Sequence, residues 1–127
     1  MVAMNTKSEK ISKIPQLWYK ALLKRDSNWE KHRIESLHHL NSALVTLKKK
    51  YQWETIYIFG SIILKGRFKP HSDIDIAIKG LNSLEYYQFV GDISAALGKR
   101  VDVVLLEECQ FASSIQKKGM RWIQDNT

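Results

Sequence analysis

Hydrophobic residues follow two different spacings in the two parts of this chain. In the first part they recur at steps of three and four residues, at Ile34, Leu37, Leu40, Leu44 and Leu47. This period is typical of an amphipathic helix whose apolar face packs on a core. Residues 27–30 (Ser-Asn-Trp-Glu) fit a capping box that would begin this helix. A shorter helix is predicted over residues 15–23, with a proline near its first turn.

The second part contains shorter apolar runs, which are rich in β-branched and aromatic residues. Such runs over residues 53–59, 72–78 and 99–106 predict strands, the first of them buried on both faces. Helices are expected at residues 62–65, 83–97 and 108–118, and a short strand after the last. The order predicts an α/β, two-layer fold with a small mixed sheet and helices mainly on one face. We expect an N-terminal helical extension over residues 1–50, disordered over 1–10, and a domain over residues 51–127.

Two carboxylates stand two residues apart in the second predicted strand. Asp73 and Asp75 would point to the same face, because side chains alternate along a strand. Like charges held this close raise each other's pKa unless a cation lies between them. Carboxylate oxygens suit Mg²⁺, which proteins commonly hold together with substrate phosphates. The pair therefore predicts a site for phosphate chemistry.

A third carboxylate, Asp102, is the only charge within the apolar stretch of the third predicted strand. Burying a lone carboxylate is costly unless it is paired or coordinates a cation. One interpretation is an ion pair with Arg100 or a hydrogen bond at the strand end. The other places Asp102 beside the first two aspartates, in a cluster that holds two divalent ions.

The junction after the first predicted strand has the character of a phosphate-binding loop. A strand, a glycine and a serine followed by a helix present backbone N–H groups and a hydroxyl to an anion. Gly60 would let a phosphate approach the backbone, and Ser61 could donate a hydrogen bond to it. Lys65 and Arg67 add positive charge nearby. A Gly-Ser pair alone is more often a plain turn, and the aspartates that follow favour the functional interpretation.

Taken together, these motifs resemble the minimal nucleotidyltransferases of the DNA polymerase β-like superfamily. The resemblance covers roughly residues 53–125 and is carried by Phe-Gly-Ser at 59–61, Lys-Gly at 65–66, Pro-x-Ser-Asp-Ile-Asp at 70–75 and Val-Asp-Val-Val at 101–104. The chain departs from the family in one respect. Eleven residues separate Ser61 from Asp73, one more than is common, and Ile62 stands where a basic residue is usual.

The resemblance implies transfer of AMP from ATP to an acceptor hydroxyl. Asp73, Asp75 and Asp102 would be catalytic and hold two Mg²⁺ ions, with Asp102 also helping to deprotonate the acceptor. Gly60 and Ser61 would bind the phosphates of ATP. Minimal nucleotidyltransferases are typically paired with a HEPN-domain toxin, a ribonuclease, and act as its antitoxin by adenylylating a toxin tyrosine. A homodimer or a hetero-oligomer with the toxin is compatible with this role.

Two other functions fit the same residues. The chain could be a catalytically idle antitoxin that neutralises its partner by binding alone, which the additional residue after Ser61 favours. It could also be a transferase acting on a small molecule, with a homodimer supplying the missing wall of the acceptor site. A nucleic-acid-binding module is disfavoured, because an aspartate cluster without metals repels phosphate.

The charge of the chain is unevenly distributed and bears on its partners. The formal net charge is +7, and residues 1–50 hold all of this excess, with 11 Lys and Arg against 4 Asp and Glu. A basic, apolar extension is typical of docking to an acidic partner. His32, His38 and His39 lie on it without nearby metal-ligating residues, so we expect them to face solvent.

The composition bears on possible disulfides, metal sites and cellular location. Cys109 is the single cysteine, which excludes an internal disulfide and a Cys-based zinc site. No stretch is apolar over the length needed to cross a bilayer, and the N-terminus carries no apolar signal region. We therefore expect a cytoplasmic protein with no membrane partner.

Overall fold

The computed structural model describes the backbone of residues 16–124 and the side chains of residues 28–124. Its elements are α2 (Gln16–Leu47), β1 (Thr55–Phe59), the 3-10 turn η1 (Gly60–Ile63), β2 (Ile74–Lys79), α3 (Ser83–Leu97), β3 (Val101–Leu105), the 3-10 turn η2 (Leu106–Glu108), α4 (Ala112–Lys118) and β4 (Met120–Arg121). The segment 1–10, for which we predicted disorder, lies outside the described residues.

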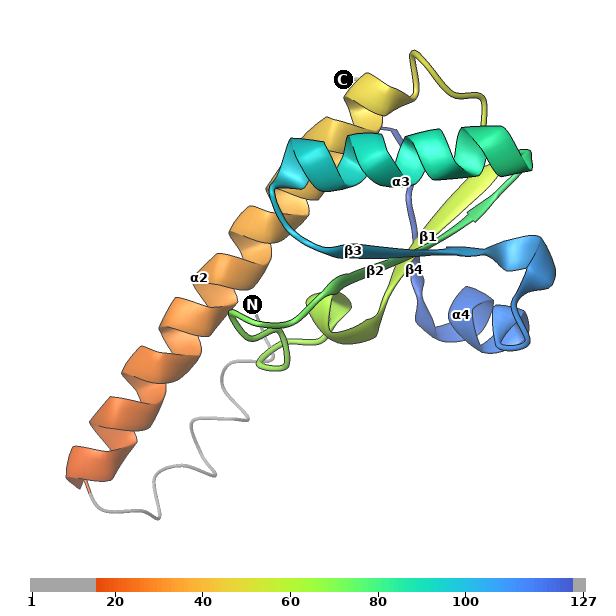
Figure 1. Cartoon of the computed structure of the whole chain (residues 1–127). Helices are drawn as coiled ribbons and strands as arrows, with labels where there is room; N and C mark the ends of the chain where they lie inside the picture. Colours follow the sequence, from red (N-terminus) through yellow and green to blue (C-terminus); the bar gives the residue numbers. More distant parts are fainter. Residues whose placement is uncertain (1–15, 125–127) are drawn as a thin grey trace.

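The four strands form one mixed sheet in the order β3-β2-β1-β4. Strand β1 is antiparallel to β2 and to β4, whereas β2 and β3 are parallel. Parallel neighbours require a crossover, and α3 provides it. Helices α2 and α3 lie on one side of the sheet and the short α4 on the other (Figure 1). The predicted α/β two-layer fold, with helices mainly on one face, is confirmed.

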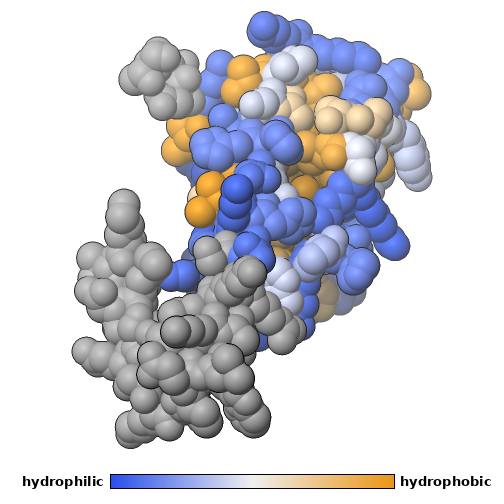
Figure 2. Space-filling view, turned by 90° about the vertical axis from the view of Figure 1, so that its left-hand side faces the viewer, coloured by the Kyte–Doolittle hydropathy of each residue, from blue (hydrophilic) through white to orange (hydrophobic). Residues whose placement is uncertain are grey.

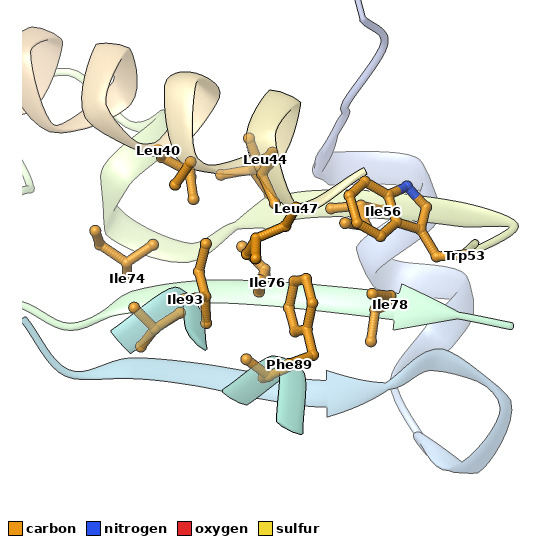
Figure 3. Close-up of a cluster of buried hydrophobic side chains, with 14 of the residues drawn as sticks. Leu40, Leu44, Leu47, Trp53, Ile56, Ile74, Ile76, Ile78, Phe89 and Ile93 are labelled. Atoms are coloured by element: carbon orange, nitrogen blue, oxygen red, sulfur yellow. The ribbon is translucent and has the colours of Figure 1, made fainter. Parts of the chain in front are cut away.

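The main core lies between the sheet and the two long helices (Figure 3). Alternate residues of β2 face it, and α2 and α3 contribute side chains that meet them. Those labelled in Figure 3 are Leu40, Leu44, Leu47, Trp53, Ile56, Ile74, Ile76, Ile78, Phe89 and Ile93. The leucine face of α2 therefore belongs to the same core as the sheet. A domain boundary near residue 50 remains a prediction.

The N-terminal helical region differs from the prediction in being continuous. One helix spans Gln16–Leu47, so the expected break between two helices is wrong. The capping-box pattern at residues 27–30 lies inside this helix. No glycine or proline occurs between residues 16 and 47, and a serine or asparagine within a helix can point to solvent without ending it. The side chains of residues 15–23 lie outside the described residues.

The core-facing side of α2 is rotated slightly from the predicted one. Ile34 is 45% exposed, although the spacing placed it on the apolar face. Arg33 is partly buried instead, and Ser36 is buried. His32 is also partly buried and stacks on Phe68, with ring centroids 5.3 Å apart, so its prediction as a solvent-facing residue is wrong.

His38 and His39 are exposed, as predicted.

Three other elements are shorter or less buried than expected. Strand β1 alternates between buried and half-buried residues, because α4 has only seven residues and covers little of the second face. The helix expected at residues 62–65 is the 3-10 turn η1, and the one expected over 108–118 begins only at Ala112, as α4. Helix α3 has the predicted bounds, with a capping box between Asn82 and Glu85.

The surface on the side shown in Figure 2 is mainly hydrophilic, and its apolar residues gather in the upper part of that view. Within the described residues, no helix combines the length and the apolar character needed to cross a membrane.

Candidate active site

The three predicted aspartates meet where β2 and β3 begin. Asp75 and Asp102 are directly opposite each other in the parallel register of these strands. Asp73 is next to the first residue of β2. Because Ile74 and Ile76 face the main core, Asp75 points to the other face of the sheet. The fold thus brings together the carboxylates that the sequence singled out.

The carboxyl of Asp75 is the most perturbed of the three. Burial is the largest cause, followed by the charges of Asp102 and Asp73, and together they raise its pKa to about 6. A carboxylate that is half-buried among like charges is unfavourable in itself. Such perturbed groups are typical of functional sites, where a cation or a substrate relieves the repulsion.

Gly60 places the end of β1 against this carboxyl. The preceding residue, Phe59, is opposite Asp75 in the antiparallel register. The φ of Gly60 is +80°, in the region that favours glycine, and a Cβ at this position would overlap Oδ2 of Asp75. Ser61 follows directly in η1 and is half-buried. The Gly-Ser turn and the aspartates therefore form one site.

A neighbouring arginine supplies positive charge to two of the aspartates. Arg100 Nε lies 3.4 Å from Oδ1 of Asp102 and 3.7 Å from Oδ2 of Asp73. The ion pair considered for Asp102 from the sequence is thus present. The Arg100 side chain is 76% exposed, so the two pairs contribute little to stability.

The residues suit a magnesium ion in their chemistry, although they do not form a finished metal centre. Asp73, Asp75 and Asp102 offer hard oxygen ligands, and burial and the charges of Asp102 and Asp73 raise the pKa of Asp75, which a bound cation would lower. Across residues 28–124, no group of three or more His, Cys, Asp or Glu side chains is arranged to hold a metal ion.

The loop after η1 carries the two cations predicted to contact phosphate. Lys65 and Arg67 are both exposed. The charge of Lys65 helps to keep the pKa of Glu30 below its usual range, so this lysine lies near α2. Phosphate binding by the two residues remains a prediction.

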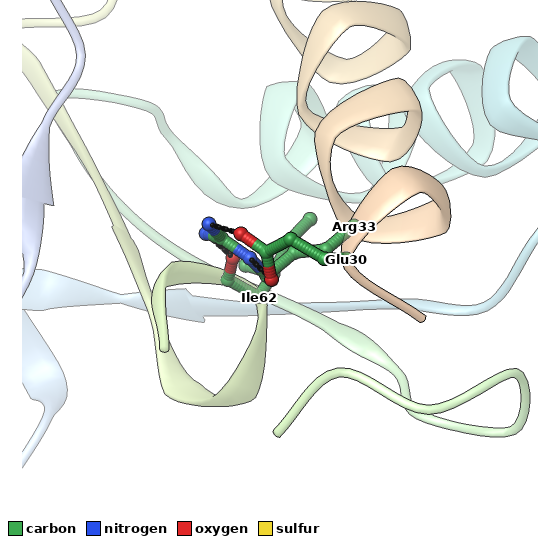
Figure 4. Close-up of polar contacts among 3 residues, drawn as sticks. All are labelled: Glu30, Arg33 and Ile62. Atoms are coloured by element: carbon green, nitrogen blue, oxygen red, sulfur yellow. Dashed lines mark hydrogen bonds and ion pairs between the residues drawn. The ribbon is translucent and has the colours of Figure 1, made fainter. Parts of the chain in front are cut away.

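Two residues of α2, Glu30 and Arg33, also contact this region, although the sequence predicted no part for them in the site. Arg33 donates a hydrogen bond from Nη1 to the carbonyl of Ile62, 3.0 Å away, and Glu30 pairs with Arg33 (Figure 4). The spacing of residues along α2 contained one signal that could have placed Arg33 on the buried side of the helix. Arg33 precedes Leu37, Leu40 and Leu44 at steps of four and three, so it continues the core-facing side better than Ile34 does.

The family is decided by a match to the family model of the polymerase beta nucleotidyltransferases, which covers residues 41–126. This chain belongs to that family. The match includes the end of α2, the whole sheet and all three aspartates. The resemblance on which the sequence analysis relied is confirmed, and the chain is a nucleotidyltransferase by family.

Two solved structures share the fold of this nucleotidyltransferase. The crystal structure of the toxin-antitoxin MntA-HepT is 22% identical, with a TM-score of 0.51 over 69% of this chain and 73% of the other. A crystal structure of a toxin-antitoxin with AMP-PNP is 24% identical, with a TM-score of 0.53 over 67% and 74%. The chain matches no curated protein.

The raised pKa of Asp75 predicts how stability depends on pH in metal-free buffer. Because its pKa is about 6 in the folded chain and 3.8 for an unperturbed aspartate, the ionised group destabilises the fold above pH 6. That penalty disappears as the pH falls from about 7 towards 4. One pKa unit is worth about 1.4 kcal/mol, and solvent screens this half-exposed group. We therefore expect Asp75→Asn to raise the free energy of unfolding by about 1 to 2 kcal/mol at pH 8 and by little at pH 4.

Urea denaturation in EDTA at both pH values measures this difference. An equal effect of Asp75→Asn at pH 8 and pH 4 would contradict it.

Proposed function

We propose that this chain is a metal-dependent nucleotidyltransferase that moves AMP from ATP to a hydroxyl of a partner HEPN-type toxin, with tyrosine as the acceptor, and so acts as the antitoxin. The observation that carries the proposal is the register of Asp75 opposite Asp102, directly beside Gly60. The family supports the reaction type. The two structural neighbours, both toxin-antitoxin assemblies and one with AMP-PNP, support a protein partner and an adenine nucleotide.

Each residue has a distinct part in this reaction. The acceptor oxygen attacks the α-phosphorus of ATP, its proton passes to the Asp102 carboxylate, and pyrophosphate leaves. Ser61 and the backbone N–H groups beside Gly60 would donate hydrogen bonds to the phosphates being released. Asp73 and Asp75 would hold Mg²⁺, which when bound neutralises the charge of the triphosphate. Catalysis then comes mainly from positioning and from charge neutralisation.

The direct test is the intact mass of a co-expressed HEPN-type toxin after incubation with this protein, ATP and Mg²⁺. We expect the toxin to gain the mass of one or more AMP units, and the gain to disappear when EDTA removes the metal. A stable complex without any gain, with each of the four nucleoside triphosphates, would refute the transferase proposal.

A second function, neutralisation by binding alone, is favoured by one observation at the site. The guanidinium of Arg100 already lies beside Asp73 and Asp102. In a site that no longer binds metal, such a cation would offset the charge of the aspartates. The two functions differ in one result. A binding-only antitoxin carrying Asp73→Asn and Asp75→Asn would still neutralise its toxin at equimolar amounts, whereas a catalytic antitoxin would not.

The N-terminal extension is proposed to dock the toxin, because it carries the whole positive excess of the chain. We expect deletion of residues 1–26 to abolish co-purification of the toxin. The deletion keeps the part of α2 that packs in the core, from Leu37 to Leu47, so the fold should persist. Pull-down and circular dichroism of the shortened protein measure the two effects. Co-purification of the toxin with the shortened chain would refute the docking role.

A further inference from the structure

The turn that carries Gly60 and Ser61 is short and is anchored on its apolar side. It contains four residues, of which Ile62 is buried in the main core, and no side chain caps its N-terminal end. At its other end the N–H of Leu64 donates to the carbonyl of Ser61, at 3.0 Å. Additional support for the polar backbone of the turn would hold its N–H groups in one arrangement.

That support comes from α2, through a pair of charged side chains. Arg33 donates from Nη1 to the carbonyl of Ile62 at 3.0 Å, and from Nε to Oε1 of Glu30 at 3.0 Å. Its Nη2 bonds the other carboxylate oxygen of Glu30, so the pair is bidentate (Figure 4). The carboxylate of Glu30 thus orients Arg33 toward the carbonyl of Ile62 in η1.

Burial distinguishes this pair from the other ion pairs among residues 28–124. The side chains of Arg33 and Glu30 are 15% and 21% exposed, whereas those of Lys50 and Asp92 are 60% and 36% exposed. The hydrogen bonds of this carboxylate keep its pKa below the usual range, with the bond from Arg33 as the largest cause. Removing water from a charged pair has a cost, which fixed geometry and additional hydrogen bonds offset. An apolar residue would pack at position 33 without that cost, but it could not bond the carbonyl of Ile62.

We propose that Arg33, oriented by Glu30, is a positioning residue for the nucleotide-binding loop 60–66. It fixes η1 so that Ser61 and the neighbouring N–H groups meet the phosphates of the nucleotide. This inference rests on the proposed function, because it takes the Gly-Ser turn to be the phosphate contact. It also gives α2 a part in nucleotide binding, in addition to its place in the core.

The test compares nucleotide binding and loop order in three variants. Arg33→Met keeps the apolar stem and removes the donors, and Arg33→Lys keeps the charge but loses the bidentate geometry. Lys50→Met is a control that breaks an exposed ion pair away from the loop, between the residues after α2 and helix α3. Isothermal titration with AMP-PNP and Mg²⁺ measures affinity without turnover. Hydrogen exchange measures the protection of the amides of residues 61–66.

We expect Arg33→Met to weaken AMP-PNP binding about tenfold and to raise the KM for ATP similarly, with kcat changed less than about threefold. Exchange should accelerate in residues 61–66 and not in β2 or α3. Arg33→Lys should fall between this variant and the unchanged protein, and Lys50→Met should match the unchanged protein. Adding Glu30→Gln to Arg33→Met should weaken binding little further, because both act through one contact.

Two results distinguish a failure of the positioning role of Arg33 from a failure of the proposed function. If Arg33→Met binds AMP-PNP as the unchanged protein does, whether or not its melting temperature falls, the pair is only structural and the inference is wrong. If the unchanged protein binds no nucleotide at all, the proposed function fails and this inference fails with it.

Discussion

Replacing Asp73 and Asp75 by asparagine is expected to abolish AMP transfer while the protein remains folded. Both carboxylates lie at the start of β2, and the pKa of Asp75 is raised by burial and by its acidic neighbours. Asparagine has a similar shape but no charge, so it would hold a magnesium ion poorly. The loss of such charge stabilisation costs at least about a hundredfold in rate. Mass spectrometry of the toxin, over a time course with ATP and Mg²⁺, measures the rate.

The stability of the same variant is the control for this prediction. Removing mutually repelling carboxylates should raise the melting temperature in EDTA by a few degrees at pH 8. A matched change at Asp102 gives a second control. Its pair with Arg100 is exposed, so Asp102→Asn should cost less than about 1 kcal/mol of stability. A loss of several kcal/mol would show that Asp102 is structural. Unchanged transfer by the Asp73→Asn/Asp75→Asn variant would remove the aspartates from the mechanism.

Replacing Gly60 by alanine is expected to damage the site far more than the fold. A Cβ here would overlap the Oδ2 atom of Asp75, which is the end of a side chain and can rotate away. That rotation moves a carboxylate out of its catalytic position, so we expect transfer to fall about a hundredfold. The positive φ of +80° adds a backbone strain of about 1 to 2 kcal/mol. Transfer rates and urea denaturation measure the two effects.

Gly91 provides the matched control for the alanine substitution. It lies in α3, and a Cβ there would meet nothing within 4 Å. Gly91→Ala should therefore leave transfer unchanged and stabilise the helix by about 0.5 to 1 kcal/mol. If Gly60→Ala destabilises the protein but transfers AMP at the normal rate, the close approach of β1 to Asp75 has no part in catalysis.

The contrast between well-predicted and poorly predicted elements has a local cause. Helix α3 has the predicted bounds, and local residues fix both of its ends in the structure. Asn82 and Glu85 cap its start, and Gly98 ends it in the left-handed conformation. The sequence predicts two helices in place of α2, because residues 27–30 match a capping box. Such a pattern marks the start of a helix only where the preceding residues are not helical. The sequence contained that pattern, but no breaker that would have made it a boundary.

The sequence by itself determined the strands, the fold class and the three aspartates of the candidate site. These depend on local alternation along each strand and on the order of elements. The parallel pairing of Asp75 with Asp102 comes from the structure. Only the tertiary structure decided that Gly60 lies against Asp75, that Arg100 pairs with two of the aspartates, and that Arg33 supports the turn at Ile62. Each is a contact between residues of different elements, whose directions and distances follow from packing and not from spacing along the chain.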